Sequence, residues 1–157
     1  MNIINARIED KDRIIDLYKD AIEKIKDSPF TPYWEFGVHP TEESLTEAIE
    51  KKELFVLWEE KPLAAMVLTP LDDNTLELHL LVVSPDCQRK GIGKIMIEKA
   101  IDIAAKRSFT KIILDVIKTN LPARHLYENM GFVFVKDNSN YFPDGSKLEL
   151  LLYELVL

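Results

Sequence analysis

Hydrophobic residues recur along the chain with two different spacings, which predict helices and strands in turn. Between residue 9 and about residue 27, apolar side chains return every three or four positions, as on one face of an amphipathic helix. The residues of that face are Ile14, Tyr18, Ala21, Ile22 and Ile25. Between residues 75 and 80, apolar and polar residues alternate instead, which is typical of a strand with one buried face.

The same patterns can be followed to the end of the chain. They predict strands over residues 2–8, 54–58, 63–69, 75–83, 111–117, 132–136 and 147–156, and helices over residues 9–27, 41–49, 91–106 and around 123–130. Thr41 is a favourable N-cap for the second helix, and Gly131 is expected to end the last one. The predicted order of elements is therefore β-α-α-β-β-β-α-β-α-β-β.

This order indicates the fold class. Polar turn segments between the middle strands are typical of antiparallel hairpins, whereas helices separate the later strands. We therefore expect an α/β fold, in which a mixed sheet carries helices on both faces. No repeat or linker interrupts the chain, so residues 1–157 are expected to form a single domain.

Composition narrows the class of protein. With 46% hydrophobic and 30% charged residues, the 157-residue chain resembles soluble globular proteins. No stretch approaches the roughly 20 apolar residues that cross a bilayer, so no membrane contact is expected. A formal net charge of −7 argues against nucleic-acid binding, because surfaces that follow phosphates are basic. The acidic charge suits a cationic substrate such as an amine, and it equally suits an ordinary acidic surface.

Cysteine and histidine are scarce. Cys87 is the one cysteine, which rules out an internal disulfide and a zinc site with several cysteines. The three histidines are scattered and show no spacing typical of metal ligands, so no metal is expected. A reducing, cytoplasmic location is the simplest interpretation.

The most specific motif is Gln88-Arg89-Lys90-Gly91-Ile92-Gly93, which follows an apolar strand and precedes a helix. Glycines at such a place let backbone N–H groups approach an anion, and the N-terminus of the helix adds partial positive charge. The sequence predicts a pyrophosphate site here, although a plain strand-to-helix turn can carry the same two glycines. The motif is not a P-loop, because the Gly-Lys-Ser/Thr ending is missing.

The strand before this motif and the motif itself resemble the acetyl-coenzyme A signature of the GNAT superfamily. That signature reads Gln/Arg-x-x-Gly-x-Gly/Ala after a strand, and every defined position is filled. A second block, Asn120 with Ala123, Tyr127, Gly131 and Phe132, is similar to the later motif of the family. The resemblance spans residues 77–132. It implies an N-acetyltransferase that takes acetyl-coenzyme A as co-substrate and passes the acetyl group directly to an amine in a ternary complex.

The resemblance also implies which residues bind the co-substrate. Backbone groups after residue 80 would pair with the pantetheine arm, and the N–H of Leu81 would polarise the thioester carbonyl. The full set is Leu81, Val82, Val83, Gln88, Arg89, Lys90, Gly91, Ile92, Gly93, Lys94, Asn120 and Tyr127. Alternation of polar and apolar residues stops at Leu80, which indicates either a β-bulge that frees an N–H or an ordinary strand buried on both sides. Asn120 would bond the pantetheine amides or only cap its helix.

The resemblance implies two catalytic residues. Glu77 lies eleven residues before Gln88, where many family members carry the general base, and Tyr127 matches the general acid that protonates the leaving thiolate. Glu77 and His79 share one face of the strand, so His79 is an alternative base or an acceptor contact. Each of these residues could also have a purely structural role. Glu77 and His79 could belong to a solvated polar face of the strand, and Tyr127 could be a core residue.

The acceptor is the least defined partner. The aromatic loop over residues 28–40 lies where family members shape the acceptor pocket, so Tyr33 and Trp34 are expected to contact a small-molecule or peptide amine, although Trp34 could equally plug the core. The apolar segment 148–157 could pack across a homodimer. The alternative to an enzyme is a non-catalytic regulatory module that binds acyl-coenzyme A.

Overall fold

A twisted sheet runs through the molecule and carries the predicted site. The computed structural model describes residues 2–26, 28, 34–87 and 90–157. The strands of the main sheet are β1 (Asn2–Asn5), β2 (Leu54–Trp58), β3 (Pro62–Pro70), β4 (Thr75–Val83), β5 (Lys111–Ile117), β9 (Leu150–Val156) and β6 (Val133–Asp137). They lie in the order β1-β2-β3-β4-β5-β9-β6, and among these strands only β4 and β5 pair in parallel. A small hairpin of β7 (Asn140–Tyr141) and β8 (Lys147–Leu148) extends from the sheet.

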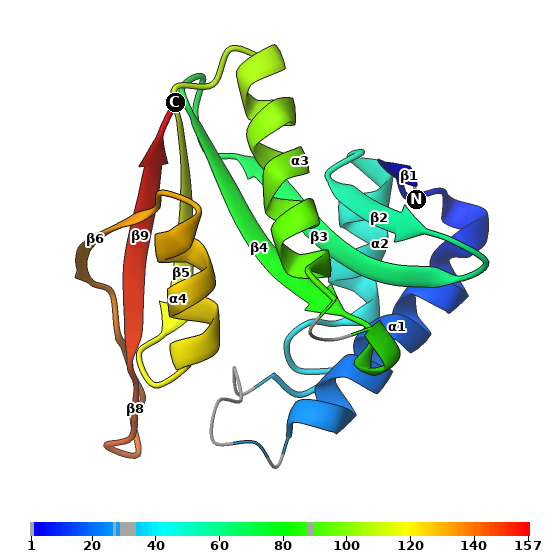
Figure 1. Ribbon diagram of the computed structural model, residues 1–157. Coiled ribbons are helices and arrows are strands. Elements are labelled where there is room, and N and C mark those ends of the chain that lie inside the picture. Colours follow the sequence, from blue (N-terminus) through cyan, green and yellow to red (C-terminus); the bar gives the residue numbers. More distant parts are fainter. Residues whose placement is uncertain (1, 27, 29–33, 88–89) are drawn as a thin grey trace.

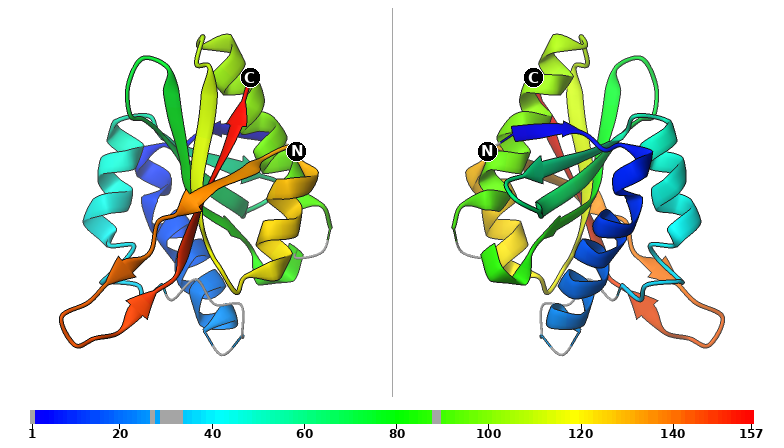
Figure 2. Two further views of the ribbon diagram at one scale, coloured as in Figure 1. Left: turned by 90° about the vertical axis from the view of Figure 1, so that its left-hand side faces the viewer. Right: turned by 90° about the vertical axis from the view of Figure 1, so that its right-hand side faces the viewer.

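Helices cover both faces of the sheet, as the sequence predicts (Figures 1 and 2). On one face lie α1 (Lys11–Ile25) and α2 (Glu42–Glu50), and on the other lie α3 (Ile92–Lys106) and α4 (Leu121–Asn129). Short 3-10 turns, η1 (Ile8–Asp10) and η2 (Pro85–Cys87), precede α1 and α3. In the described part of the chain no helix has the length and apolar character needed to cross a bilayer.

Two separate hydrophobic cores follow from the alternation of side chains along the strands. On β2, for example, Phe55 and Leu57 are buried on the α3 side, whereas Leu54 and Val56 are buried beneath α1 and α2. Successive residues of a strand point to opposite faces, so a strand covered on both faces must be apolar throughout. This is why the middle strands lack polar residues at most positions.

Local signals set the ends of two helices. Thr41 and Ser44 form a reciprocal capping box, in which each side chain bonds the backbone N–H of the other at 3.0 Å. After α4, Gly131 adopts a positive φ of 97°, which confirms the predicted glycine stop. A Cβ at Gly131 would lie 3.3 Å from Cδ1 of Leu155, so the small residue also allows close packing there.

The predicted bounds of two strands are wrong, and the first helix begins at Lys11 rather than at residue 9. The first strand ends at Asn5 rather than at residue 8, because Asp10 is buried and its Oδ2 accepts a hydrogen bond from Nε of Arg7 at 3.0 Å, which closes a 3-10 turn. The predicted last strand is divided at Glu149 into β8 and β9, since β8 pairs with β7 rather than with the main sheet.

A β-bulge interrupts β4. Of the two alternatives left open by the sequence, a bulge or an ordinary strand buried on both sides, the structure has the bulge. Between the pairs Val67–His79 and Ala65–Val82, the single residue Met66 of β3 faces two residues of β4, Leu80 and Leu81. Leu80 has a positive φ of 51°, a backbone conformation that leucine rarely adopts. The buried hydroxyl of Tyr18 on α1 donates a hydrogen bond of 2.7 Å to the carbonyl oxygen of Leu80. Helix α1 therefore holds the bulge in place.

β4 and β5 separate shortly before the bulge. They pair only from Thr75–Lys111 to Glu77–Ile113, after which β5 continues along β9 alone. Figure 1 shows the two strands diverging from a shared end, with α3 and α4 in front of them. The second half of β4 thus has an edge that β5 does not cover.

We expect Tyr18→Phe to lower the free energy of unfolding by about 1–3 kcal/mol, because the Leu80 carbonyl would stay buried without its donor. Chemical denaturation would measure the change. Tyr141→Phe is the control, since Tyr141 is 73% exposed and its hydroxyl should contribute less than about 0.5 kcal/mol. Equal stabilities for the two variants would contradict the role of Tyr18.

Candidate functional site

The glycine motif lies at the N-terminus of α3, next to the end of β4. Gly91 is the N-cap residue and has a positive φ of 74°, and a Cβ on it would meet no atom within 4 Å. The first turn of α3 therefore begins beside open space, where its free backbone N–H groups can receive an anion. Lys90 and Lys94 are exposed at the same place. Gln88 and Arg89, which were predicted to contribute, lie outside the described residues.

Gly93 has a second role that the sequence did not indicate. A Cβ at this position would lie 3.1 Å from Cδ2 of Leu126, so a larger residue would collide with α4. The buried Ile92 joins the core on the α3 side. The two predicted cofactor residues that follow Gly91 therefore also fix how α3 packs against its neighbours.

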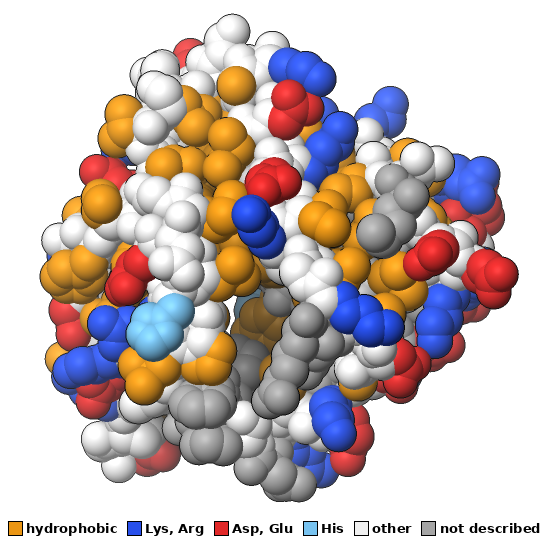
Figure 3. Space-filling view, viewed as in Figure 1, with side chains coloured by type: hydrophobic (Ala, Val, Ile, Leu, Met, Phe, Trp, Pro, Cys, Tyr) orange, Lys and Arg blue, Asp and Glu red, His pale blue; other side chains and the backbone are white. Residues whose placement is uncertain are grey.

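β4 and β5 no longer pair after Glu77, and we call the gap between them the split. The split lies next to the glycine motif. Val82 is buried beneath α1, whereas Leu81 and Val83 pack partly buried on the α3 side. The surface is hollowed between α4 and the N-terminal end of α3 (Figure 3). An extended ligand that entered the split would meet the uncovered backbone edge of β4, as a further strand would.

Tyr127 lies on α4, on the α3 side of the sheet. Its ring is half-buried against the core and lies 5.9 Å from the ring of Phe132. Burial raises the pKa of the Tyr127 hydroxyl to about 12, so the group stays protonated at neutral pH and can donate a proton or a hydrogen bond. Asn120 begins the same helix, and its side chain accepts a hydrogen bond from the N–H of Ala123 at 3.3 Å, as a helix cap does.

Glu77 and His79 lie on the opposite face of β4. Both side chains are about one-third exposed, and Oε1 of Glu77 lies 3.8 Å from Nε2 of His79. Burial, and secondarily the charge of Asp115, raises the pKa of Glu77 above its ordinary value. Burial, with a smaller effect of His39, lowers the pKa of His79 to about 4. At neutral pH the imidazole of His79 is therefore neutral, and both side chains can accept hydrogen bonds.

The described end of the aromatic loop, residues 34–40, borders the same face. Trp34 packs partly buried against the core beneath α1 and α2, so the core interpretation holds for part of its surface. Its ring also contacts His39 edge-on, with the ring centroids 6.4 Å apart. Because His39 is close enough to affect the pKa of His79, Trp34 and the Glu77–His79 pair border one region. Tyr33, the other predicted acceptor contact, lies outside the described residues.

Three residues of this face were missed in the sequence. Thr69 of β3 bonds both Nε2 of His79, at 2.8 Å, and Oε1 of Glu53, at 3.1 Å. Asp115 of β5 adds negative charge beside Glu77 and accepts a hydrogen bond from Nδ2 of Asn138 at 2.9 Å. Strand register alone brings these residues together, so no local spacing could have revealed them.

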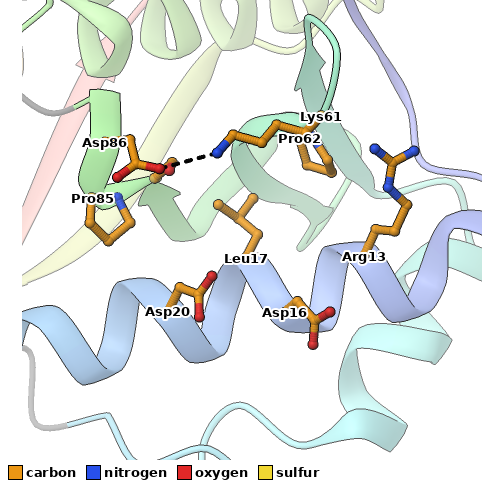
Figure 4. Close-up of a pocket in the computed structure, with 9 residues that line it drawn as sticks. Arg13, Asp16, Leu17, Asp20, Lys61, Pro62, Pro85 and Asp86 are labelled. Carbon is orange, nitrogen blue, oxygen red and sulfur yellow. Dashed lines mark hydrogen bonds and ion pairs between the residues drawn. The ribbon is translucent and has the colours of Figure 1, made fainter.

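A separate pocket of about 330 Å³ lies between α1 and the segments before β3 and after β4 (Figure 4). Asp16, Asp20 and Arg13 of α1 line it, and Lys61 spans it with an ion pair to Asp86, whose Nζ–Oδ2 distance is 3.1 Å. None of the described residues predicted for the site lines this pocket. It is therefore distinct from the split between β4 and β5.

The described residues contain no group of three histidine, cysteine, aspartate or glutamate side chains close enough to hold a metal ion. The described residues offer hydrogen-bond acceptors on one face of the sheet, a protonated phenol on the other, and a helix N-terminus beside the end of β4.

Comparisons with known proteins agree with this arrangement. Residues 17–132 match the acetyltransferase (GNAT) family. The ribosomal protein bS18-alanine N-acetyltransferase of Escherichia coli is 34% identical over 100 residues, which are 62% of this chain and 68% of that enzyme. The mycothiol acetyltransferase of Beutenbergia cavernae is 35% identical over 79 residues, which are 50% of this chain and 27% of that protein.

Solved structures show the same fold. The ribosomal-protein-S18-alanine N-acetyltransferase from Escherichia coli superposes with a TM-score of 0.76 at 24% identity, covering 99% of this chain and 92% of that one. A GNAT family acetyltransferase from Elizabethkingia anophelis with acetyl-CoA bound gives a TM-score of 0.66 at 22% identity, covering 76% and 85%. The match over most of the sequence and the shared fold lead to one conclusion: the chain belongs to the GNAT family, whose members transfer the acetyl group of acetyl-coenzyme A to an amine.

Proposed function

We propose that the acceptor amine binds on the face of the sheet that carries Glu77 and His79, and that it attacks the acetyl thioester within the split between β4 and β5. The observation that supports this is the arrangement of the split itself. It opens directly after Glu77, and it connects the face of the sheet that carries Glu77 and His79 with the face that carries Tyr127. An amine and a thioester that enter from opposite sides would meet there in a ternary complex.

In this mechanism Glu77 is the general base. An amine with a pKa of roughly 10 is mostly cationic at neutral pH, so it must lose a proton before it can attack. Glu77 accepts this proton, directly or through a water molecule. Its raised pKa makes the carboxylate a stronger base than an exposed glutamate would be.

Tyr127 is the proposed general acid. The bond between the acetyl carbon and sulfur breaks as the new bond to nitrogen forms, and the sulfur leaves with the electron pair. The Tyr127 hydroxyl can give its proton to that sulfur, since burial keeps it protonated. Among the described residues, no side chain or backbone group bonds this hydroxyl, so it is available.

The remaining predicted residues would hold the donor. The backbone of Leu81, Val82 and Val83 would bond the pantetheine arm, with the N–H of Leu81 facing the thioester oxygen, because the bulge exposes this edge. Lys90, Gly91, Ile92, Gly93 and Lys94 would hold the pyrophosphate at the N-terminus of α3. The Asn120 side chain caps α4 through its oxygen, and its amide N–H groups could still bond the donor.

The acceptor class is a small-molecule or peptide amine. The negative charges of Glu77 and Asp115 favour a cation on this face, and the exposed part of Trp34 offers an aromatic surface on which a cation can bind. The related enzymes named above act on a ribosomal protein alanine and, by its name, on mycothiol, which differ widely in size. Variable loops therefore have to decide the acceptor.

Three wider expectations stay predictions. The enzyme is expected in the cytoplasm, and its net charge of −7 argues against a nucleic-acid partner. A homodimer is also expected, and the support for it is an exposed apolar surface on β6 and at the end of β9. Its members are Val133, Phe134, Val135, Val156 and Leu157.

The experiment that tests the function measures thiol release from acetyl-coenzyme A across a panel of amines. The panel should include polyamines, amino acids, aminoglycosides and peptides with a free N-terminal alanine. We expect release at least 10-fold above buffer hydrolysis for one class of acceptor. Flat traces together with tight acetyl-coenzyme A binding would favour the regulatory module over the enzyme.

Glu77→Gln should reduce kcat/KM about 100-fold at neutral pH, because the variant cannot accept the proton of the amine. In the wild type the rate should fall as pH drops through the raised pKa of Glu77, and this acid limb should vanish in the variant. Glu154→Gln is a matched control, since Glu154 lies opposite Ile113 on the same face and one strand beyond β5. Superimposable profiles for Glu77→Gln and the wild type would remove Glu77 as the base.

Tyr127→Phe should lower kcat about 10- to 100-fold while the dissociation constant of acetyl-coenzyme A stays within about 2-fold, because only the acidic proton is lost. Initial rates and calorimetric titration would give the two values. An unchanged kcat would contradict the role of Tyr127 as the acid, and a large loss of affinity would show that its hydroxyl binds the donor in the ground state.

A further inference from the structure

A chain of hydrogen bonds lies behind the proposed acceptor site. Oγ1 of Thr69 is 2.8 Å from Nε2 of His79 on one side and 3.1 Å from Oε1 of Glu53 on the other. The backbone of Glu53 is fixed at both ends, because its N–H donates to Ala48 at 2.9 Å and its carbonyl accepts from Leu68 at 2.8 Å. Thr69, His79 and Glu53 are all partly buried, so the chain has a defined geometry.

The direction of these bonds follows from the number of protons available. A threonine hydroxyl has one hydrogen, and an ionised carboxylate can only accept. The hydrogen of Thr69 is therefore donated to Glu53, which leaves a lone pair of Thr69 facing Nε2 of His79. Nε2 must then carry the hydrogen of the ring. Glu77, whose Oε1 lies 3.8 Å from Nε2, favours the same arrangement because it is a second acceptor on that side.

The second ring nitrogen follows from the first. His79 is neutral at neutral pH, since its pKa is lowered to about 4, so the ring carries a single N–H. With that hydrogen on Nε2, Nδ1 keeps its lone pair and is the acceptor atom of the ring. If neither tautomer were favoured by its neighbours, either ring nitrogen could accept a hydrogen bond from a ligand.

We propose that Glu53 and Thr69 are positioning residues, which hold His79 as the Nε2–H tautomer and so present Nδ1 as an acceptor for an N–H of the amine substrate. This deepens the proposed function and rests on it. His79 would orient the ammonium group by a hydrogen bond without taking its proton, and the proton would pass to Glu77.

The tautomer can be read without any turnover. Long-range proton–nitrogen NMR spectra of protein labelled at its three histidines show which ring nitrogen carries the hydrogen, and His79→Gln identifies the signals of His79. We expect the wild type to show Nε2–H, with a proton resonance protected from exchange by Thr69. Hydrogen on Nδ1 in the wild type would overturn the proposal even if the enzyme is active.

Two matched pairs of variants test the chain. Thr69→Val should lose the protected Nε2–H resonance and about 10-fold in kcat, whereas Thr69→Ser should keep both. Glu53→Met should free the Thr69 hydroxyl to donate to Nε2, which raises the Nδ1–H population, whereas Glu53→Gln retains an acceptor oxygen and should keep the wild-type tautomer.

The outcomes separate this inference from the function on which it rests. Wild-type spectra and rates in Thr69→Val and Glu53→Met would overturn the positioning role and leave the acetyltransferase intact. If the wild-type tautomer is as expected but Thr69→Val and Glu53→Met shift it without lowering the rate, the proposed role of Nδ1 is wrong. If no amine reacts at all, the proposed function fails and the spectra still decide the tautomer.

Discussion

The hydrogen bond between the hydroxyl of Tyr18 and the carbonyl of Leu80 lies at the bulge of β4, close to the point where β4 stops pairing with β5. A leucine in the left-handed region costs roughly 1–3 kcal/mol and persists only where its surroundings impose it. Tyr18 supplies part of that constraint from α1, which is far from β4 in the sequence. The bulge lies just beyond Glu77, the last residue of β4 that pairs with β5, and it turns the second half of β4 further away from β5. The hollow, the uncovered strand edge and the access to the α3 N-terminus all depend on this divergence.

The sheet also acts as a partition between two proton-transfer groups. Glu77 and His79 lie on the face of α1 and α2, while Tyr127 lies on the face of α3 and α4. A carboxylate and a phenol in direct contact would bond to each other and be less available to substrates. In the proposed mechanism, their separation lets each group meet only the atom whose proton it handles. The negative field of Glu77 and Asp115 is likewise kept on the side where a cation is expected.

The spacing of apolar residues, together with the turn and capping residues between them, was enough to predict most of the fold. The bounds of β4 and β5 agree with the alternation and length of their apolar runs, and the Thr41 cap is a local signal that needs no knowledge of the fold. The first strand was predicted too long, because the pairing of Arg7 with the buried Asp10 overrides the apolar pattern. The bulge could be anticipated from the loss of alternation after Leu80, although only the structure decides between the two alternatives.

The candidate site was less predictable than the fold. Residues within the two motifs could be found, since a loop and a helix start are local in sequence. Glu53, Thr69 and Asp115 could not be found, because β2, β3 and β5 bring them to Glu77 and His79 by register. Tyr18 has the spacing of a core residue, and nothing in the sequence distinguishes a tyrosine that anchors a bulge from one that only fills space.

The contact between Gly93 and Leu126 links two parts of the site that are otherwise separate. Gly93 belongs to the first turn of α3, beside the anion loop, and Leu126 precedes Tyr127 on α4. At 3.1 Å from the end of a flexible leucine, a methyl group could be admitted by a small turn of that side chain, but a branched residue would have to displace the helix. The size of one side chain in the first turn of α3 therefore affects where α4, and with it Tyr127, lies relative to the glycine motif.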